Sequence, residues 1–155
     1  MEVKTLQDVI RHGALCFGSQ AAFRYKEKKE VVEKTYLDLN RDSMAVSRMV
    51  ESLGMGGKHI ALLGVTSYPW IISYFGITGS GSVAVPIDAQ LPAPAIWELL
   101  NRADVEMLIY DEIRADVAAG IREHCPKISQ VISMQAREDA PPTLSLSALL
   151  ARHAG

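Results

Sequence analysis

Short apolar segments of strand length alternate with longer segments of helical periodicity, and this alternation constrains the fold more than any other feature. The apolar segments are His59–Gly64, Ser82–Val85, Met107–Tyr110 and Ile128–Ile132. A strand that is apolar along its whole length is typical of a parallel sheet, where both faces are buried. Parallel neighbours are joined by right-handed crossovers, which place helices on the faces of the sheet. The sequence therefore predicts an α/β fold with a mostly parallel sheet and helices on both faces.

A β-hairpin is expected ahead of this sheet. Ala22–Tyr25 and Val31–Thr35 have the composition of strands, and Lys26–Glu30 separates them. A charged run between two such strands predicts a solvated hairpin turn. The last apolar strand, in contrast, precedes a polar, proline-bearing segment, Arg137–Pro142, which we interpret as a loop.

Two capping boxes predict where the first helices begin. In this motif a threonine hydroxyl accepts a hydrogen bond from the backbone three residues on, and the acidic side chain there returns one. Thr5 with Asp8 predicts a short first helix, and Thr35 with Asp38 predicts a long helix to about Leu53. The expected apolar stripes are Leu6, Val9, Ile10 and Leu15 on the first, and Leu39, Val46, Val50 and Leu53 on the second.

The remaining helices follow from caps, prolines and glycines. Ser67 is expected to cap a helix from Pro69 to about Thr78, which is apolar nearly all round and should be largely buried. Pro86 is expected to stop the strand that starts at Ser82. Three further helices are expected at Ala95–Arg102, Ile113–His124 and Leu144–Arg152.

Composition excludes several function classes. The 155 residues suit one domain, and 16 Lys+Arg against 18 Asp+Glu give a net charge of −2. A chain without a basic surplus is a poor partner for nucleic acid or for an acidic membrane surface. Cys16 and Cys125 are far apart, so we expect two free thiols in a reducing compartment. The N-terminus lacks signal-peptide character and no apolar stretch is long enough for a membrane span, so we expect the cytoplasm.

Two glycine clusters resemble phosphate-binding loops only superficially. Gly54–Lys58 lies between a helix and a strand, whereas a phosphate loop runs from strand to helix. Ser52 and His59 also stand where the Walker pattern needs Gly and Ser or Thr. The cluster Gly76, Gly79 and Gly81 lies in the same wrong order for a dinucleotide fingerprint. Both clusters are interpreted as helix ends, and an independent nucleotide-binding domain is the weakest reading.

No residue pattern identifies a metal site or an activated nucleophile. His12 and Cys16 share one helix face, but two ligands do not make a tetrahedral site. Ligands of parallel sheets bind outside the carboxyl ends of the strands. Those ends are Gly64–Ser67, Pro86–Ala89, Tyr110–Glu112 and Ser133–Gln135. The acidic residues near predicted strand ends or helix starts are Asp88, Asp104, Asp111 and Glu112. Ordinary caps and turns are the favoured explanation for each of them, with a ligand as the alternative.

Several segments, in order, resemble the N-terminal part of adenylate-forming acyl-CoA synthetases, the AMP-binding ligases. Lys34–Leu39 resembles the Thr-Tyr-x-Glu-Leu segment of that family, with Asp38 in place of Glu. Gly79–Asp88 resembles its Ala-Gly-x-Ala-x-Val-Pro-Leu-Asp segment, with Ser82 where a small apolar residue is usual. Further similar segments are Ala22–Tyr25, His59–Gly64, Trp70–Ile77, Leu99–Val105 and Leu108–Asp111. The resemblance runs from about Leu6 to Leu150 and is greatest to bacterial long-chain fatty-acid–CoA ligases.

The resemblance implies a single N-terminal subdomain, residues 1–155, of a longer ATP-dependent acyl-CoA synthetase. The family's phosphate loop, ribose-binding acidic segment and catalytic lysine lie beyond the matched stretch. We therefore assign no catalytic, cofactor-binding or metal-binding residue to this chain and expect it to be inactive alone. The resemblance implies ATP, Mg²⁺ and CoA as cofactors of the full enzyme, a carboxylic acid as its substrate, and its other subdomains as partners.

Two questions stay open at this point. The chain could instead be a complete small α/β module that binds a partner without catalysis, since 155 residues can bury an adequate core. An apolar docking surface would favour the longer enzyme. The oligomeric state is also open, with a homodimer as one option.

Overall fold

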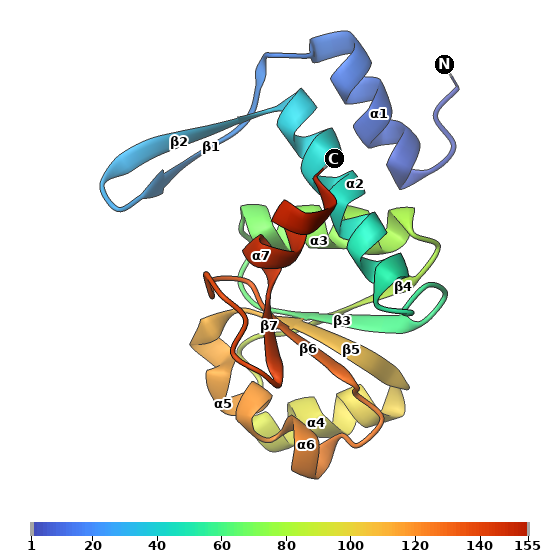
Figure 1. Ribbon diagram of the computed structural model, residues 1–155, viewed down its shortest axis with the longest axis vertical. Coiled ribbons are helices and arrows are strands. Elements are labelled where there is room, and N and C mark those ends of the chain that lie inside the picture. The colour runs from blue at the N-terminus through green and yellow to red at the C-terminus, as the bar shows by residue number, and fades with distance from the viewer. Residues whose placement is uncertain (1, 155) are drawn as a thin grey trace.

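The computed structural model describes residues 2–154, in which helices and strands alternate as expected (Figure 1). The strands are β1 (Ala21–Glu27), β2 (Glu30–Thr35), β3 (His59–Leu63), β4 (Val83–Ile87), β5 (Val105–Tyr110), β6 (Gln130–Ser133) and β7 (Thr143–Ser145). The helices are α1 (Leu6–Phe17), α2 (Tyr36–Ser52), α3 (Tyr68–Gly79), α4 (Ala93–Arg102), α5 (Ala115–Ala119), α6 (Ile121–His124) and α7 (Leu146–His153), with a 3₁₀ turn at Glu112–Arg114.

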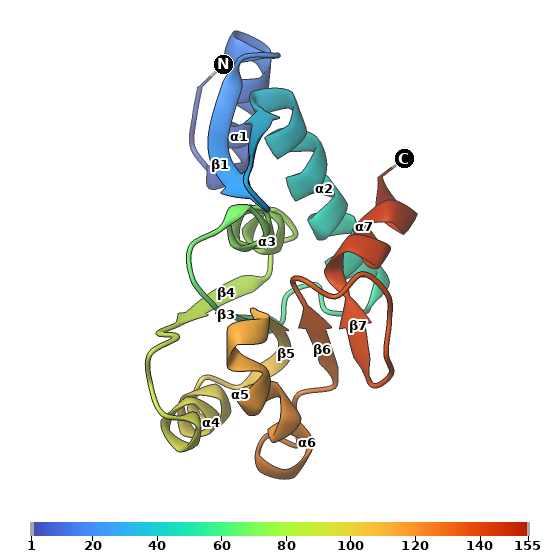
Figure 2. The same ribbon diagram turned by 90° about the vertical axis from the view of Figure 1, so that its left-hand side faces the viewer.

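Five parallel strands form the central sheet in the order β4-β3-β5-β6-β7, and β1 and β2 form a separate antiparallel hairpin. Helices α2, α3 and α7 lie over one face of the sheet, and α4, α5 and α6 lie over the other (Figure 1). Helix α1 and the hairpin extend beyond α2 and α3, away from the sheet (Figure 2). The α/β class, the parallel sheet, the helices on both faces and the hairpin are thus confirmed.

The unbroken apolar sequence of β3 is explained by two cores, one on each face of the sheet. Ile60 and Leu62 contribute to the core under α2 and α3, while Ala61 and Leu63 contribute to the core under α4 and α5. All four side chains have no solvent exposure. Successive strand residues point to opposite faces, so a strand covered on both sides must be apolar at every position.

Helices α2 and α3 cross closely because small residues meet at the crossing. A Cβ atom added at Gly76 would lie 2.3 Å from Val46 Cβ, so only glycine fits there. The Ser47 hydroxyl donates to the Gly76 carbonyl oxygen at 2.7 Å, which joins the two helices. Gly76 therefore serves the packing of one helix on another, whereas the sequence indicated only helix ends for this glycine cluster.

Both capping boxes form as predicted. The Thr5 and Thr35 hydroxyls accept from the backbone N–H groups of Asp8 and Asp38 at 3.1 Å, and each aspartate accepts a hydrogen bond from the backbone N–H of its threonine in return. The apolar stripe expected on α1 is wrong. Of its four members only Ile10 is buried, whereas the rest are exposed, because α1 packs against α2 and α3 from one side only.

The hairpin strands are longer than expected and include most of the charged run. Strand β1 reaches Glu27 and β2 begins at Glu30, so the turn consists of Lys28 and Lys29 alone. Both lysines have positive φ, 47° and 69°, as a two-residue turn that matches the strand twist requires. The charged side chains fit in strands here because the end of the hairpin is exposed to solvent.

Pro86 does not stop β4, contrary to expectation. The backbone N–H of Val83 donates to the Lys58 carbonyl oxygen, and β4 pairs with β3 from Val83 to Ile87. The backbone N–H groups of successive strand residues point alternately to the two sides of the strand. Because the N–H of Val83 points to β3, the nitrogen of Pro86, three residues on, points away from β3. Proline is tolerated in an edge strand when it faces solvent in this way.

The C-terminal half departs from expectation at two points. The helix expected at Ile113–His124 is divided at Gly120, where a Cβ would lie 2.2 Å from the Trp97 ring. A fifth parallel strand, β7, lies within what was expected to be the start of the last helix. Helix α3 is also less buried than expected, since Trp70, Ile71, Tyr74 and Phe75 pack against the core while remaining partly exposed.

Candidate functional site

The carboxyl ends of the parallel strands meet at one edge of the sheet, where a ligand of this fold class is expected. The strand order changes direction between β3 and β5, and a crevice usually opens at such a point. Here Gly64 follows β3 and Asp111 follows β5. A Cβ at Gly64 would lie 2.6 Å from Asp111 Cβ, so the aspartate fills the space that a crevice would need.

Asp111 caps the short 3₁₀ turn after β5. The side chain is 5% exposed, and its Oδ1 accepts from the backbone N–H of Ile113 at 3.0 Å. The backbone N–H of Asp111 donates to the Leu63 carbonyl oxygen at 2.8 Å, which continues the β3–β5 ladder. The capping interpretation of this residue therefore accounts for the contacts that it makes.

Glu112 ties the ends of β5 and β6 together. Its Oε1 accepts from the Ser133 hydroxyl at 2.5 Å and from the Tyr110 hydroxyl at 3.2 Å. Its backbone N–H donates to Gln135 Oε1 at 2.8 Å. Burial, and to a lesser degree the Glu112 carboxylate, raises the pKa of the Tyr110 phenol. In this cluster the neutral Tyr110 phenol and the Ser133 hydroxyl both donate hydrogen bonds to the Glu112 carboxylate.

The other two acidic candidates do not join this cluster. Asp88 accepts from the backbone N–H of Gln90 and shapes the loop after β4. Asp104 precedes β5, at the opposite edge of the sheet, and pairs with Lys127 at 2.7 Å. That ion pair lowers the pKa of the Asp104 carboxyl. The loop after β4 is instead held by Arg114, which donates to the carbonyl oxygens of Ala89 and Leu91 at 2.7 Å.

A hollow of about 430 Å³ lies beside the end of β6, between α2, α3 and α7. Its floor is apolar, and the polar side chains in its lining are Lys34, Arg41, Asp42, Tyr68 and Ser147. The Tyr68 hydroxyl donates to Asp42 Oδ2 at 2.5 Å, and the Lys34 ammonium lies 5.2 Å from the centre of the Tyr68 ring. The pKa of Tyr68 is raised by burial and then by its hydrogen bond to Asp42. This hollow can take an apolar group with an anion near Lys34.

Sequence reasoning missed the rim of this hollow. Asp42 and Tyr68 are 26 residues apart, and Lys34 comes from the hairpin. No sequence signal pointed to Tyr68, because the helix was expected to begin at Pro69, whereas α3 begins at Tyr68. Only the fold brings the three residues together.

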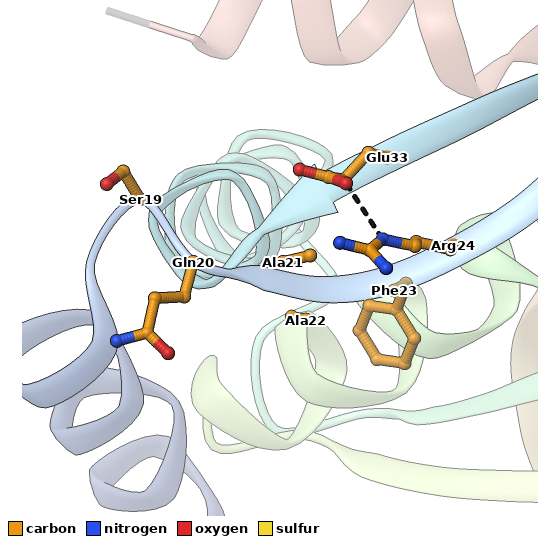
Figure 3. A pocket seen from close by; sticks show the side chains of 7 residues that line it. All are labelled: Ser19, Gln20, Ala21, Ala22, Phe23, Arg24 and Glu33. Carbon is orange, nitrogen blue, oxygen red and sulfur yellow. Dashed lines mark hydrogen bonds and ion pairs between the residues drawn. The ribbon is translucent and has the colours of Figure 1, made fainter.

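Two more hollows lie away from this edge. One, of about 720 Å³, is open and lies along the start of the hairpin, where Arg24 pairs with Glu33 at 2.8 Å (Figure 3). The other, of about 700 Å³, lies below β6, between that strand and helices α5 and α6. Small and apolar side chains line much of it, including Ala115, Ala118 and Val131.

The remaining candidates have structural roles. Gly54 and Gly57 have positive φ in the turn after α2, and the backbone N–H of Gly57 donates to the Ser82 hydroxyl. Cys16 Sγ lies 3.4 Å from His12 Nε2, and within residues 2–154 no group of three metal-binding side chains occurs. Cys16 and Cys125 are free thiols, the first exposed and the second buried. Within the described part of the chain, no helix has both the length and the apolar character to cross a bilayer.

Comparison with known proteins identifies clear relatives. The sequence profile of the family described as "AMP-binding enzyme" matches residues 11–151. A long-chain-fatty-acid–CoA ligase of Thermus thermophilus is 25% identical over 141 residues, which are 90% of this chain and 26% of that protein. The ligase FadD13 of Mycobacterium tuberculosis is 30% identical over 99 residues, which are 63% of this chain and 20% of that protein.

Solved structures share the fold over nearly the whole chain. The inhibitor-bound N-terminal domain of FACL13 from Mycobacterium tuberculosis has a TM-score of 0.83 at 25% identity, over 99% of this chain and 37% of that one. The anthranilate CoA ligase AuaEII, in complex with anthranoyl-AMP, has a TM-score of 0.86 at 20% identity, over 97% of this chain and 28% of that one. The chain thus spans about a quarter of the length of the Thermus ligase that it matches.

Proposed function

The chain belongs to the AMP-binding enzyme family of adenylate-forming acyl-CoA ligases, and from this premise we propose that it is the N-terminal part of a longer ATP-dependent acyl-CoA ligase. One observation carries the proposal. The family profile matches nearly all of this chain, while the chain corresponds to only 26% of the Thermus thermophilus ligase. The remaining parts of such an enzyme would be its partners.

The proposed enzyme catalyses two half-reactions. A carboxylate oxygen attacks the α-phosphorus of ATP, which gives an acyl-adenylate and releases pyrophosphate. The thiol of CoA then attacks the acyl carbon, which gives the thioester and releases AMP. Mg²⁺ would offset the phosphate charge in the first step. A long-chain fatty acid is the proposed substrate, because relatives from Thermus thermophilus and Mycobacterium tuberculosis carry that name.

Within that enzyme we assign residues 1–155 the role of one structural subdomain. The polar side chains at the carboxyl edge support this role, because Asp111, Glu112 and Arg114 each hold a loop or a turn. No residue of this chain is proposed to bind ATP, CoA or Mg²⁺. The chain alone is therefore expected to have no ligase activity.

Apolar surface supports docking against another part of the enzyme. Leu15 and Val31 are 72% and 66% exposed, and Ile113 lies exposed beside the carboxyl edge. The hollow below β6 adds a second apolar surface. Neighbouring subdomains usually cover surfaces of this kind.

A self-contained binding module remains the alternative function. It is favoured by the central sheet, which has a hydrophobic core on each face within this chain. A complete module would need no further subdomain, and its exposed apolar residues would be scattered singly over the surface.

The first test is pyrophosphate exchange by the purified chain with ATP, Mg²⁺ and palmitate. The Thermus thermophilus ligase serves as the positive control. We expect no exchange above background from this chain. Robust exchange would overturn the assignment of a purely structural role.

Binding of an anilinonaphthalene sulfonate dye separates the two functions. A docking subdomain should bind the dye while its circular dichroism stays that of a folded protein. Serine at Leu15 and Val31 should then reduce the fluorescence, whereas serine at Leu99, which is 40% exposed on α4, should change it less. A folded chain that binds no dye would favour the self-contained module.

The cellular location and the oligomeric state of the protein are also proposed. We place the protein in the cytoplasm, because the free thiols Cys16 and Cys125 suit a reducing compartment. A homodimer is the proposed state if the apolar surface is not covered by another subdomain. Light scattering over a range of protein concentrations would measure this.

A further inference from the structure

A small polar cavity lies where α1, α2 and α3 meet. Its volume is about 10 Å³, at the lower limit of what one water molecule needs. The cavity is lined by Gln7 and Ile10 of α1, Asn40, Ser43, Met44 and Ser47 of α2, and Phe75 and Gly79 of α3. None of these side chains carries a charge.

Ser43 contributes a buried hydroxyl that lacks a protein partner. The residue is 4% exposed, and its Oγ makes no hydrogen bond with any residue in the range 2–154. A buried hydroxyl without a partner destabilises the folded state, so native structures nearly always supply one. The position of Ser43 on the cavity wall makes the cavity the place where a partner can bind.

Two neighbouring side chains can complete the coordination of a small polar ligand. The Ser47 hydroxyl already donates to the Gly76 carbonyl oxygen, which leaves its oxygen able to accept. The Gln7 carboxamide comes from α1, and its Nε2 lies 3.8 Å from the position that a Cβ would take at Gly79. Gln7 forms no side-chain hydrogen bond with the described residues. Donors and acceptors from two helices thus border the same space.

We propose that this cavity binds one water molecule, which joins the Ser43 and Ser47 hydroxyls of α2 to the Gln7 carboxamide of α1. Buried waters typically make about three hydrogen bonds, which these groups supply. The volume excludes a larger ligand, and the uncharged lining gives an ion no counter-charge. The site is independent of the proposed ligase function, because it lies in the helical layer and not at the carboxyl edge of the sheet.

Ser73 provides a matched control. It is also a helix residue with a fully buried hydroxyl, and its Oγ likewise has no partner in the described part of the chain. Ser73 does not line the cavity. Replacing either serine by alanine changes helix propensity equally, so the difference between the two variants isolates the effect of the cavity.

The test compares the melting temperatures of S43A and S73A. With a bound water, S43A removes a hydrogen bond and leaves the water and Gln7 poorly satisfied. S73A only removes an unpaired hydroxyl. We expect S43A to melt about 2–4 °C below S73A, the shift typical of one hydrogen bond in a chain of this size. Equal melting temperatures, or a higher one for S43A, would overturn the proposal.

A second measurement follows the water directly. Nuclear Overhauser spectra of the native chain should show a long-lived water near the backbone amides of Ser43 and Ser47. The signal should be lost in S43A, weakened in Q7M, where the side chain keeps its length, and retained in S73A. Absence of the signal in the native chain would contradict the proposal even if every variant folds.

Discussion

The sheet with its covering helices and the N-terminal arm, defined as α1 with the β1–β2 hairpin, are stabilised in different ways. In the sheet, the four consecutive residues Ile60–Leu63 of β3 have no solvent exposure. In the arm, Leu15 is 72% exposed and Val31 is 66% exposed. The difference teaches that apolar sequence alone does not bury a residue, because burial needs elements on every side.

The arm is attached by a few aromatic contacts instead of a core of its own. The Phe17 and Tyr36 rings lie 5.1 Å apart between their centres. Phe23 and Tyr25 of the hairpin lie 6.0 Å and 6.2 Å from the Tyr68 ring. Substitutions of the same chemical kind should therefore have unequal effects in the two regions.

The largest expected difference is between L62A and L15A. Leu62 is fully buried beneath α2 and α3, so its truncation should lower the free energy of unfolding by about 2–5 kcal/mol. Leu15 has little contact to lose, so L15A should change it by less than about 0.5 kcal/mol. Urea denaturation at one pH measures both variants. Similar losses would show that Leu15 is covered in solution and would remove the contrast between the regions.

The next difference is between glycines. An alanine Cβ at Gly76 would lie 2.3 Å from Val46 Cβ and 2.8 Å from the Ser43 carbonyl oxygen. G76A should therefore destabilise the chain by about 1–3 kcal/mol. At Gly13 of the arm, the nearest atom would be Tyr36 Cδ1 at 3.0 Å, on a ring that can move. G13A should be close to neutral, because alanine also favours the helix by about 1 kcal/mol. Thermal unfolding of both variants measures the difference, and equal melting temperatures for G76A and G13A would contradict this prediction.

The two N-caps should differ less. Removing either threonine hydroxyl typically costs about 1 kcal/mol of helix stability. Thr35 caps α2, which packs against the sheet, whereas Thr5 caps α1 at the periphery. T35A should lower global stability, while T5A should mainly increase hydrogen exchange in the first turns of α1. Serine at each position is the control, since it retains the hydroxyl; a global loss in T5A equal to that in T35A would contradict this prediction.

The smallest effect concerns acid stability. The backbone N–H of Thr35 is the main cause that lowers the pKa of the Asp38 carboxyl, and it outweighs the opposing effect of burial. A group with a lowered folded-state pKa stabilises the protein above its unfolded pKa of about 3.9. That stabilisation is lost as the pH falls through the folded-state pKa. D38N should therefore have a flatter stability profile below about pH 4 than the native chain, as measured by denaturation. If stability falls as steeply with decreasing pH in D38N as in the native chain, the lowered pKa of Asp38 does not contribute to acid stability.

Local sequence signals predicted most of the fold. The two Thr-x-x-Asp motifs located the starts of α1 and α2, and Ser67 located the start of α3. Unbroken apolar runs located β3 and β5, because residues 60–63 and 107–110 are buried on both faces of the sheet. These signals act within a few residues, so a single sequence contains them in full.

Features that depend on distant residues could not be predicted in this way. Gly120 lies where the expected helix divides, and the distant Trp97 ring occupies the space that a Cβ there would need. Thr143–Ser145 is too short and too polar to indicate a strand, and only pairing with β6 makes it one. Likewise, the carboxyl edge of the sheet was expected from the strand order, whereas the contact of Tyr68 with Asp42 depends on how α2 and α3 cross.

Both outer edges of the five-stranded sheet offer few free backbone donors, which has a consequence for aggregation. On β4, Pro86 has no N–H to offer. On β7, the N–H of Thr143 donates to the Ala140 carbonyl oxygen and that of Ser145 to the Asp139 carboxylate. Exposed edges with free donors are the usual templates for amyloid-type growth. The addition of a further strand at either edge is therefore disfavoured, because Ala84 alone leaves an outward-facing N–H between Val83 and Ile87.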